Sequence, residues 1–197
     1  MKTGTLARQR AVRNVQRRLE RYYALEAGPD VVAFVEDAPR GGRETLFVRH
    51  VAEGLELSLE LPPLARARQV LDDAWLQVAE GVSHFVYIVE RARRELPATR
   101  LELELQAEVD KFVLLVLERG ATDARRARRL HGRLYERVYY LHPQGSEDGE
   151  RYRLANALAA RLIARLAARG SALTTRRVLQ DFYGSGLADK IHLARAA

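Results

Sequence analysis

Cysteine is absent from this chain of 197 residues, and only three of its 33 basic residues are lysines. Without cysteine the chain can form no disulfide, no thiolate zinc site and no iron–sulfur cluster, and it has no cysteine nucleophile. This composition is typical of a reducing compartment, so we expect a cytoplasmic location. No apolar run approaches the roughly 20 residues of a transmembrane helix. No secretory signal is visible, because Lys2 and Thr3 are not followed by an apolar segment.

The common catalytic and cofactor-binding motifs are also missing. The segment 184–186 reads Gly-Ser-Gly, which lacks the spacing of a Gly-x-Ser-x-Gly nucleophile elbow. The pair Gly41-Gly42 suits a hairpin turn and fits no nucleotide-binding fingerprint. We therefore expect no cofactor.

The charges are separated into three blocks along the chain. Net charge is +7, and arginine supplies 30 of the 33 basic residues, a ratio as typical of GC-rich coding as of a selected phosphate-binding surface. Residues 1–29 carry a net +5, residues 30–118 a net −7 and residues 119–197 a net +9. Separated blocks favour docking to a partner of opposite sign, or pairing of the blocks within the chain.

The first third of the chain is predicted to hold one helix and the only β region. Residues 5–25 place apolar side chains at helical spacing along one side. Val31–Glu36 and Glu44–Ala52 read as strands, and a turn at Glu53-Gly54 leads into a stretch in which leucine alternates with polar residues up to Leu61. The pattern predicts a three-stranded antiparallel meander over about residues 31–61, too small to stand alone.

The rest of the chain, residues 65–195, is predicted to be helical, with about four to six helices. Helical periodicity covers 65–95, 99–118, 122–141 and 150–168, followed by short helices near 173–183 and 187–195. The segment 99–118 is apolar nearly all round toward its end, which indicates a central buried helix. Together these patterns predict a mostly helical α+β fold in a single domain, residues 1–197.

Two groups of residues are weak candidates for a metal or an acid–base site. Glu80 and His84 are four residues apart on one helix face, as metal ligands can be, but that face lies opposite the apolar stripe. A solvated pair is therefore the favoured interpretation, and we expect no metal. The acid–base candidates lie on the helix 99–118: Glu108, Asp110 and Lys111, with His50 or His84 as a further member. A buried carboxylate beside a lysine can shift a pKa, although such pairs are more often structural.

Two arginine ridges are the candidates for nucleic-acid or anion binding. The first follows the segment 122–141 at four-residue intervals: Arg125, Arg129, Arg133 and Arg137. The second lies on the N-terminal helix, opposite its apolar side: Arg10, Arg13, Arg17 and Arg21. Such rows can contact successive phosphates, and nearby tyrosines can stack on unpaired bases. The alternative is that these arginines pair with the acidic middle of the same chain, and binding to a membrane surface is the least favoured outcome.

Three functions stay open from the sequence. The leading hypothesis is a non-catalytic protein–protein interaction or adaptor module, which predicts an exposed apolar patch or a symmetric dimer interface. The second is a nucleic-acid-binding protein that uses the arginine ridges. The third is an enzyme whose site lies around Asp110 and Lys111.

Overall fold

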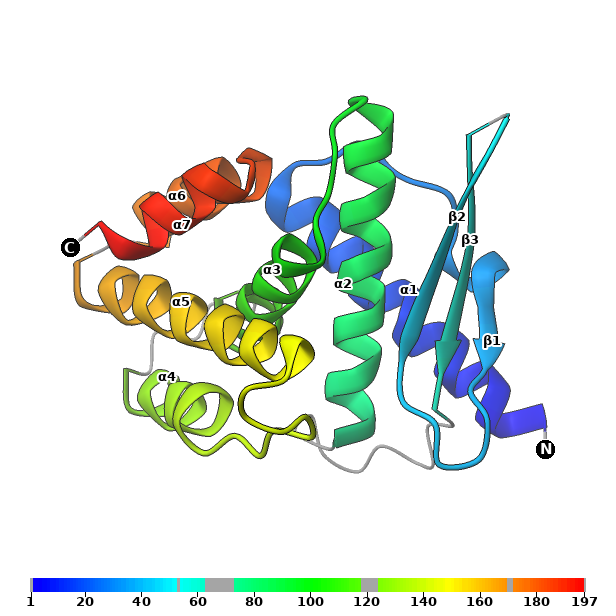
Figure 1. Ribbon diagram of the computed structural model, residues 1–197, viewed down its shortest axis with the longest axis horizontal. Coiled ribbons are helices and arrows are strands. Elements are labelled where there is room, and N and C mark those ends of the chain that lie inside the picture. The colour runs from blue at the N-terminus through cyan, green and yellow to red at the C-terminus, as the bar shows by residue number, and fades with distance from the viewer. Residues whose placement is uncertain (1, 53, 63–72, 118–123, 170–171, 197) are drawn as a thin grey trace. The chain divides into compact units, whose positions relative to one another are not determined.

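The computed structural model describes residues 2–52, 54–62, 73–117, 124–169 and 172–196 (Figure 1). The chain divides into two compact units. The first comprises Met1–Arg21 and Leu25–Pro97, and the second comprises Tyr22–Ala24 and Ala98–Ala197. A single domain over residues 1–197 stays a prediction.

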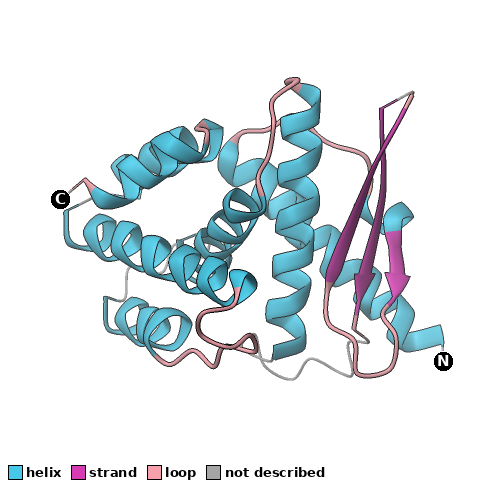
Figure 2. Cartoon of the chain, in the orientation of Figure 1, coloured by secondary structure: helices cyan, strands magenta, loops and turns pink. Residues whose placement is uncertain are grey.

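The first unit contains a three-stranded mixed sheet in the order β1-β3-β2 (Figure 2). β1 (Val35–Asp37) pairs in parallel with β3 (Gly54–Leu61), and β2 (Thr45–Val51) pairs antiparallel with the other edge of β3. The prediction of an antiparallel meander is therefore wrong, because a meander would place β2 at the centre. β3 has the most buried side chains of the three strands, and the central position suits such a strand. The β2–β3 hairpin is confirmed, although Glu53 lies outside the described residues.

The apolar run before β1 forms a short 3₁₀ helix, η1 (Val31–Phe34), where the sequence predicted a strand. Asp30 caps this helix, because its carboxylate accepts a hydrogen bond of 3.2 Å from the Val32 N–H. The Val31 N–H donates to the side-chain oxygen of Gln16 at 3.0 Å. Because side chains accept hydrogen bonds from these two backbone N–H groups, the segment does not need the hydrogen bonds of a β-sheet. Only three residues remain for β1.

Two long helices complete the first unit. α1 (Lys2–Tyr23) has its apolar side buried as predicted, although its last residues belong to the second unit. α2 (Asp73–Arg93) packs on β2 and β3. Its predicted apolar stripe is buried from Trp75 to Val86, whereas Leu71 lies outside the described residues. Unlike the sequence prediction of one apolar stripe, α2 buries side chains on nearly every side.

The second unit is built from helices. These are α3 (Arg100–Phe112), which continues as the π-helix η2 (Val113–Leu117); α4 (Ala124–His131), which continues as the π-helix η3 (Gly132–Glu136); α5 (Glu147–Arg169); α6 (Ala172–Gly184); and α7 (Leu187–Arg195). α3 begins at a capping box, in which the side chains of Thr99 and Glu102 each accept a hydrogen bond from the other residue's backbone N–H. The described residues of α3 and η2 are buried almost throughout, which confirms the predicted central helix.

The helix predicted over residues 122–141 ends earlier than expected. Regular α-helix stops at His131, a π-turn follows, and Arg137 has φ −110° and ψ 53°, outside the helical region. Gly132 and the β-branched and aromatic run Val138–Tyr140 favour helix weakly, which accounts for the early end. Leu141, the last residue of the predicted helix, is exposed.

A mostly helical α+β class with a small sheet is confirmed, and six α-helices follow the sheet within the described residues. Of the helices in this described part, none has both the length and the apolar composition that crossing a membrane requires.

We expect Gly149→Ala to destabilise the second unit. A Cβ atom added at this position in the first turn of α5 would overlap the backbone carbonyl oxygen of Pro143. Overpacking of this kind costs about 1–3 kcal/mol, more than the ~1 kcal/mol that alanine gains over glycine in a helix. The matched control is Gly184→Ala, because nothing lies within 4 Å of a Cβ added there. Urea unfolding followed by circular dichroism should show a lower midpoint for the first variant only. Equal midpoints would contradict the close approach of Pro143 to the first turn of α5.

Candidate functional site

A cluster of hydrogen-bonded polar side chains lies in the core of the second unit. We call it the α3 polar cluster, and its members are Tyr23, Gln106, Asp110 and Lys190. Asp110 Oδ1 accepts hydrogen bonds from the Tyr23 hydroxyl at 2.5 Å and from Gln106 Nε2 at 2.8 Å. On the other side of the same amide, Gln106 Oε1 accepts from Lys190 Nζ at 2.6 Å. One glutamine therefore links a carboxylate to an ammonium group.

The charged members of the cluster are removed from solvent. The exposed fraction is 1% for Asp110 and 0% for Lys190. Lys190 Nζ also donates to the Phe182 carbonyl at 2.7 Å and lies 4.2 Å from the centre of the Phe182 ring. A buried charge is tolerated only where hydrogen bonds or opposite charges compensate for the lost water. The contacts of Lys190 and Asp110 supply that compensation.

Two tyrosines against α3 have a strongly perturbed pKa. Burial raises the pKa of Tyr23 well above its usual value of 10.0, and the neighbouring Asp110 carboxylate raises it further. Burial likewise raises the pKa of Tyr135 well above 10.0, with Glu108 and Asp110 adding to the effect. The Tyr135 hydroxyl donates to the Glu108 carbonyl at 2.9 Å. Both phenols are therefore neutral hydrogen-bond donors near neutral pH.

The three acid–base candidates fall into two groups. Lys111 Nζ lies 2.9 Å from Glu108 Oε1, one turn away on α3, and both side chains are largely buried. Asp110 is held by Tyr23 and Gln106. Substrate must reach a catalytic acid or base, and the burial of Asp110 favours a structural role for it. Catalysis by these residues stays an untested hypothesis, and its other candidate, His50, is exposed on β2 of the first unit.

Lys190 and Gln106 were not predicted from the sequence as members of a site. The signal for Lys190 is its position on α7. Leu187 lies three residues before it, Ile191 one residue after it and Ala194 four residues after it. That spacing puts all four residues on the inward face of one helix, so the lysine occupies a core position. Its partner Gln106 had no such signal, because a polar residue among glutamates reads as part of a solvated face.

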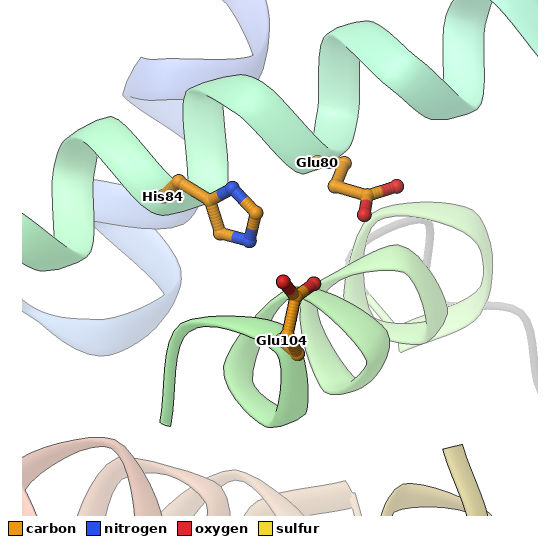
Figure 3. A group of neighbouring side chains, drawn as sticks. All are labelled: Glu80, His84 and Glu104. Carbon is orange, nitrogen blue, oxygen red and sulfur yellow. The ribbon is translucent and has the colours of Figure 1, made fainter. Parts of the chain in front are cut away.

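The metal candidates Glu80 and His84 project from the same side of α2 (Figure 3). The expected solvated pair is corrected, because His84 is buried and Glu80 is half-buried. His84 Nδ1 lies 3.9 Å from Oε2 of Glu44, just before β2. This neighbour comes from a distant part of the chain, which the helical pattern alone does not reveal. Glu104, the third side chain in the figure, belongs to α3 of the second unit.

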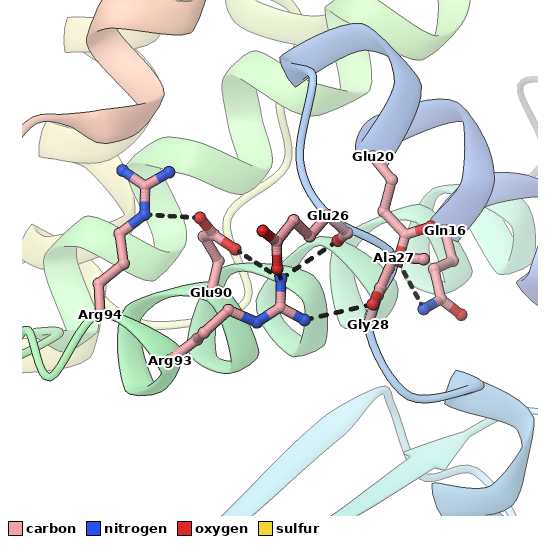
Figure 4. Close-up of polar contacts among 8 residues, drawn as sticks. All are labelled: Gln16, Glu20, Glu26, Ala27, Gly28, Glu90, Arg93 and Arg94. Atoms are coloured by element: carbon pink, nitrogen blue, oxygen red, sulfur yellow. Dashed lines mark hydrogen bonds and ion pairs between the residues drawn. The ribbon is translucent and has the colours of Figure 1, made fainter.

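A shallow depression in the first unit is lined by residues of α1, α2 and the segment between α1 and η1. Its carboxylates already have partners (Figure 4). Glu20 Oε1 accepts from Gln16 Nε2 at 2.8 Å and from the Gly28 N–H at 3.0 Å. Glu90 contacts Arg94 at 2.6 Å and Arg93 at 3.5 Å. Glu20 thus ties the segment to α1, and Arg93 ties it to α2 by donating to the carbonyls of Glu26 and Ala27, which is a structural role.

The arginine ridges are largely exposed. On α1, Arg10, Arg17 and Arg21 are exposed. Arg13 forms an ion pair with Asp30 at 2.8 Å. The Arg13–Asp30 ion pair is an example of the alternative given above, in which arginines of the ridge pair with the acidic middle of the chain. The arginines of α4 and η3 that the sequence singled out are all exposed: Arg125, Arg129, Arg133 and Arg137.

Comparison with known proteins adds no function to this geometry. The chain matches no family model, and no curated protein or solved structure is detectably similar to it.

We expect Lys190→Met to cost about 3–5 kcal/mol of unfolding free energy, because it removes one partner of a buried charged pair. The double variant Lys190→Met/Asp110→Asn should recover part of that loss, since both formal charges are then gone. Chemical denaturation of the two single variants and the double variant measures the coupling free energy. Additive effects would contradict an interaction between Lys190 and Asp110 through Gln106.

The stability of the fold should fall above about pH 10. The folded-state pKa of Tyr23 and of Tyr135 is raised, so each keeps its proton in the folded chain while the unfolded chain ionises. The contribution of each tyrosine is present below the unfolded pKa and is lost as pH rises toward the folded pKa. Urea titrations at a series of alkaline pH values should show this slope. Tyr135→Phe should reduce it, whereas an unchanged slope would show that Tyr135 does not contribute.

Proposed function

We propose that the protein is a non-catalytic protein–protein interaction module and that β2 is its binding edge. β2 is the outer strand of the sheet, and among the described residues it pairs with β3 only. The single observation that carries the proposal is the exposure of two large apolar side chains on this edge. Phe47 is 52% exposed and Val48 is 40% exposed.

An exposed apolar edge strand is a template for another strand, because its outer N–H and C=O groups lack sheet partners. Proteins usually protect such edges with proline, lysine, bulges or short strands. β2 is seven residues long and contains neither proline nor lysine. Its one arginine, Arg49, is paired across the hairpin with Glu56. These features favour binding by strand addition.

The partner strand that fits β2 is β2 of a second copy. In an antiparallel pair centred on Val48, Phe47 lies opposite Arg49 of the second copy and Leu46 lies opposite His50. No two like charges then face each other, and an aromatic ring faces a guanidinium, which is a favourable cross-strand pair. The arrangement is two-fold symmetric and closes on itself, as dimer interfaces do. We place this association in the cytoplasm, the location expected from the cysteine-free composition.

The chain is expected to dimerise, and Phe47→Lys/Val48→Lys should make it monomeric. Lysine at an edge position opposes strand pairing because burying its ammonium group is unfavourable. Sedimentation velocity over a range of protein concentrations measures the association. Because both side chains are already largely exposed, the circular dichroism spectrum should not change.

The matched control is Leu96→Lys. Leu96 lies in the same unit, outside the sheet, and is 41% exposed, close to the value for Val48. This variant should associate like the original chain. A chain that stays monomeric at all concentrations, or a β2 variant that associates unchanged, would refute the proposal.

A further inference from the structure

A row of exposed arginines follows α4 and η3 in the second unit. We call it the α4 arginine surface, and its members are Arg125, Arg128, Arg129, Arg133 and Arg137. The segment 124–137 holds six arginines and one acidic residue, Glu136. The Glu136 carboxylate lies 3.3 Å from Nδ1 of His131, on the same segment. The segment therefore carries a net charge of +5, six arginines less one glutamate.

The opposite side of this segment is fixed to the rest of the second unit. Leu130 and Leu134 are buried, and the Leu134 carbonyl accepts a hydrogen bond of 3.1 Å from the Asn156 amide on α5. The His131 ring lies 3.2 Å from the Ala160 carbonyl, also on α5. These contacts hold the helix by one face and leave the arginines on the other.

A tyrosine is displayed directly after the arginines. Tyr139 is 87% exposed, although its neighbour Tyr140 is held in place. The Tyr140 hydroxyl donates to Asn156 Oδ1 at 3.1 Å, and the Arg153 guanidinium lies 4.6 Å from the centre of its ring. Arg153 also donates to the His142 carbonyl. Contacts therefore hold the segment on both sides of Tyr139. The exposure of the Tyr139 ring is not the result of a loosely attached segment.

We infer that the α4 arginine surface and Tyr139 form a binding site for single-stranded nucleic acid. Guanidinium groups contact phosphates without reading sequence, and an exposed aromatic ring stacks on an unpaired base. Arg125 and Arg129 on α4 are separated by about 6 Å along the helix axis, and Arg133 follows on η3, so one strand can meet several of these arginines. Tyr139 separates this ligand from other polyanions, because a duplex or an acidic peptide offers no unpaired base.

Fluorescence anisotropy with a labelled oligodeoxythymidine tests the site. The oligonucleotide should exceed the roughly 4–16 nucleotides of common single-strand sites, and salt should be varied from about 50 to 200 mM. Binding is expected to weaken linearly in a log–log plot. Arg129→Gln/Arg133→Gln removes two phosphate contacts and should reduce the slope by about 1.4, whereas Arg129→Lys/Arg133→Lys should keep it. The matched control is Arg10→Gln/Arg17→Gln on α1, which changes the net charge equally and should leave the slope unchanged.

Variants of Tyr139 distinguish base stacking from general electrostatic attraction. Tyr139→Ala should weaken binding by roughly 5- to 100-fold, the value of one base stacked on an aromatic ring, and Tyr139→Phe should restore it. Four results would overturn the inference: no binding at about 50 mM salt, an equal loss in the α1 control, no effect of Tyr139→Ala, or equal affinity for a duplex of the same length.

Discussion

Lys190 and Asp110 can share the core of the second unit because Gln106 lies between them. The glutamine accepts a hydrogen bond from the ammonium group through its oxygen and donates one to the carboxylate through its nitrogen. An amide side chain carries an acceptor oxygen and a donor NH₂ group, so it can do both at once and each charge meets a dipole of the favourable sign. The Tyr23 hydroxyl donates a second hydrogen bond to the Asp110 carboxylate, and the Phe182 carbonyl accepts a second one from the Lys190 ammonium group. This network fixes the end of α1, α3, α6 and α7 with respect to one another.

The helices could be predicted because their patterns are local. The stripe on α1 and the apolar end of α3 appear in any window of three or four turns. The prediction of a strand beginning at Val31 was wrong for the same reason, because β-branched composition is a local signal. The side chains of Gln16 and Asp30 accept hydrogen bonds from the backbone of η1, and these contacts exist only in the folded chain. Strand order depends on contacts distant in sequence, so the central position of β3 could not be obtained from alternation alone.

Only part of the α3 polar cluster could be predicted: Asp110 was a candidate from the sequence, whereas Gln106 and Lys190 were not. The helical pattern indicated that Asp110 is drawn inward, but it pointed only to the nearest lysine in sequence, Lys111. Lys111 pairs with Glu108 one turn away, while the lysine linked to Asp110 comes from α7, 80 residues later in the chain. Adjacency in sequence on a helix does not imply a shared face, whereas a charged residue at a core position of an amphipathic helix does require a buried partner.

The two proposed binding surfaces would depend on opposite physical terms. The association proposed for β2 uses the backbone groups and exposed apolar side chains of an edge strand, so it should change little with salt. The binding proposed for the α4 arginine surface uses phosphate contacts and counterion release, so it should weaken steeply with salt. Because the two surfaces belong to different units, a variant of one leaves the residues of the other unchanged. Salt therefore assigns an observed association to one surface before any residue is altered: binding that persists at high salt points to β2, and binding lost there points to α4.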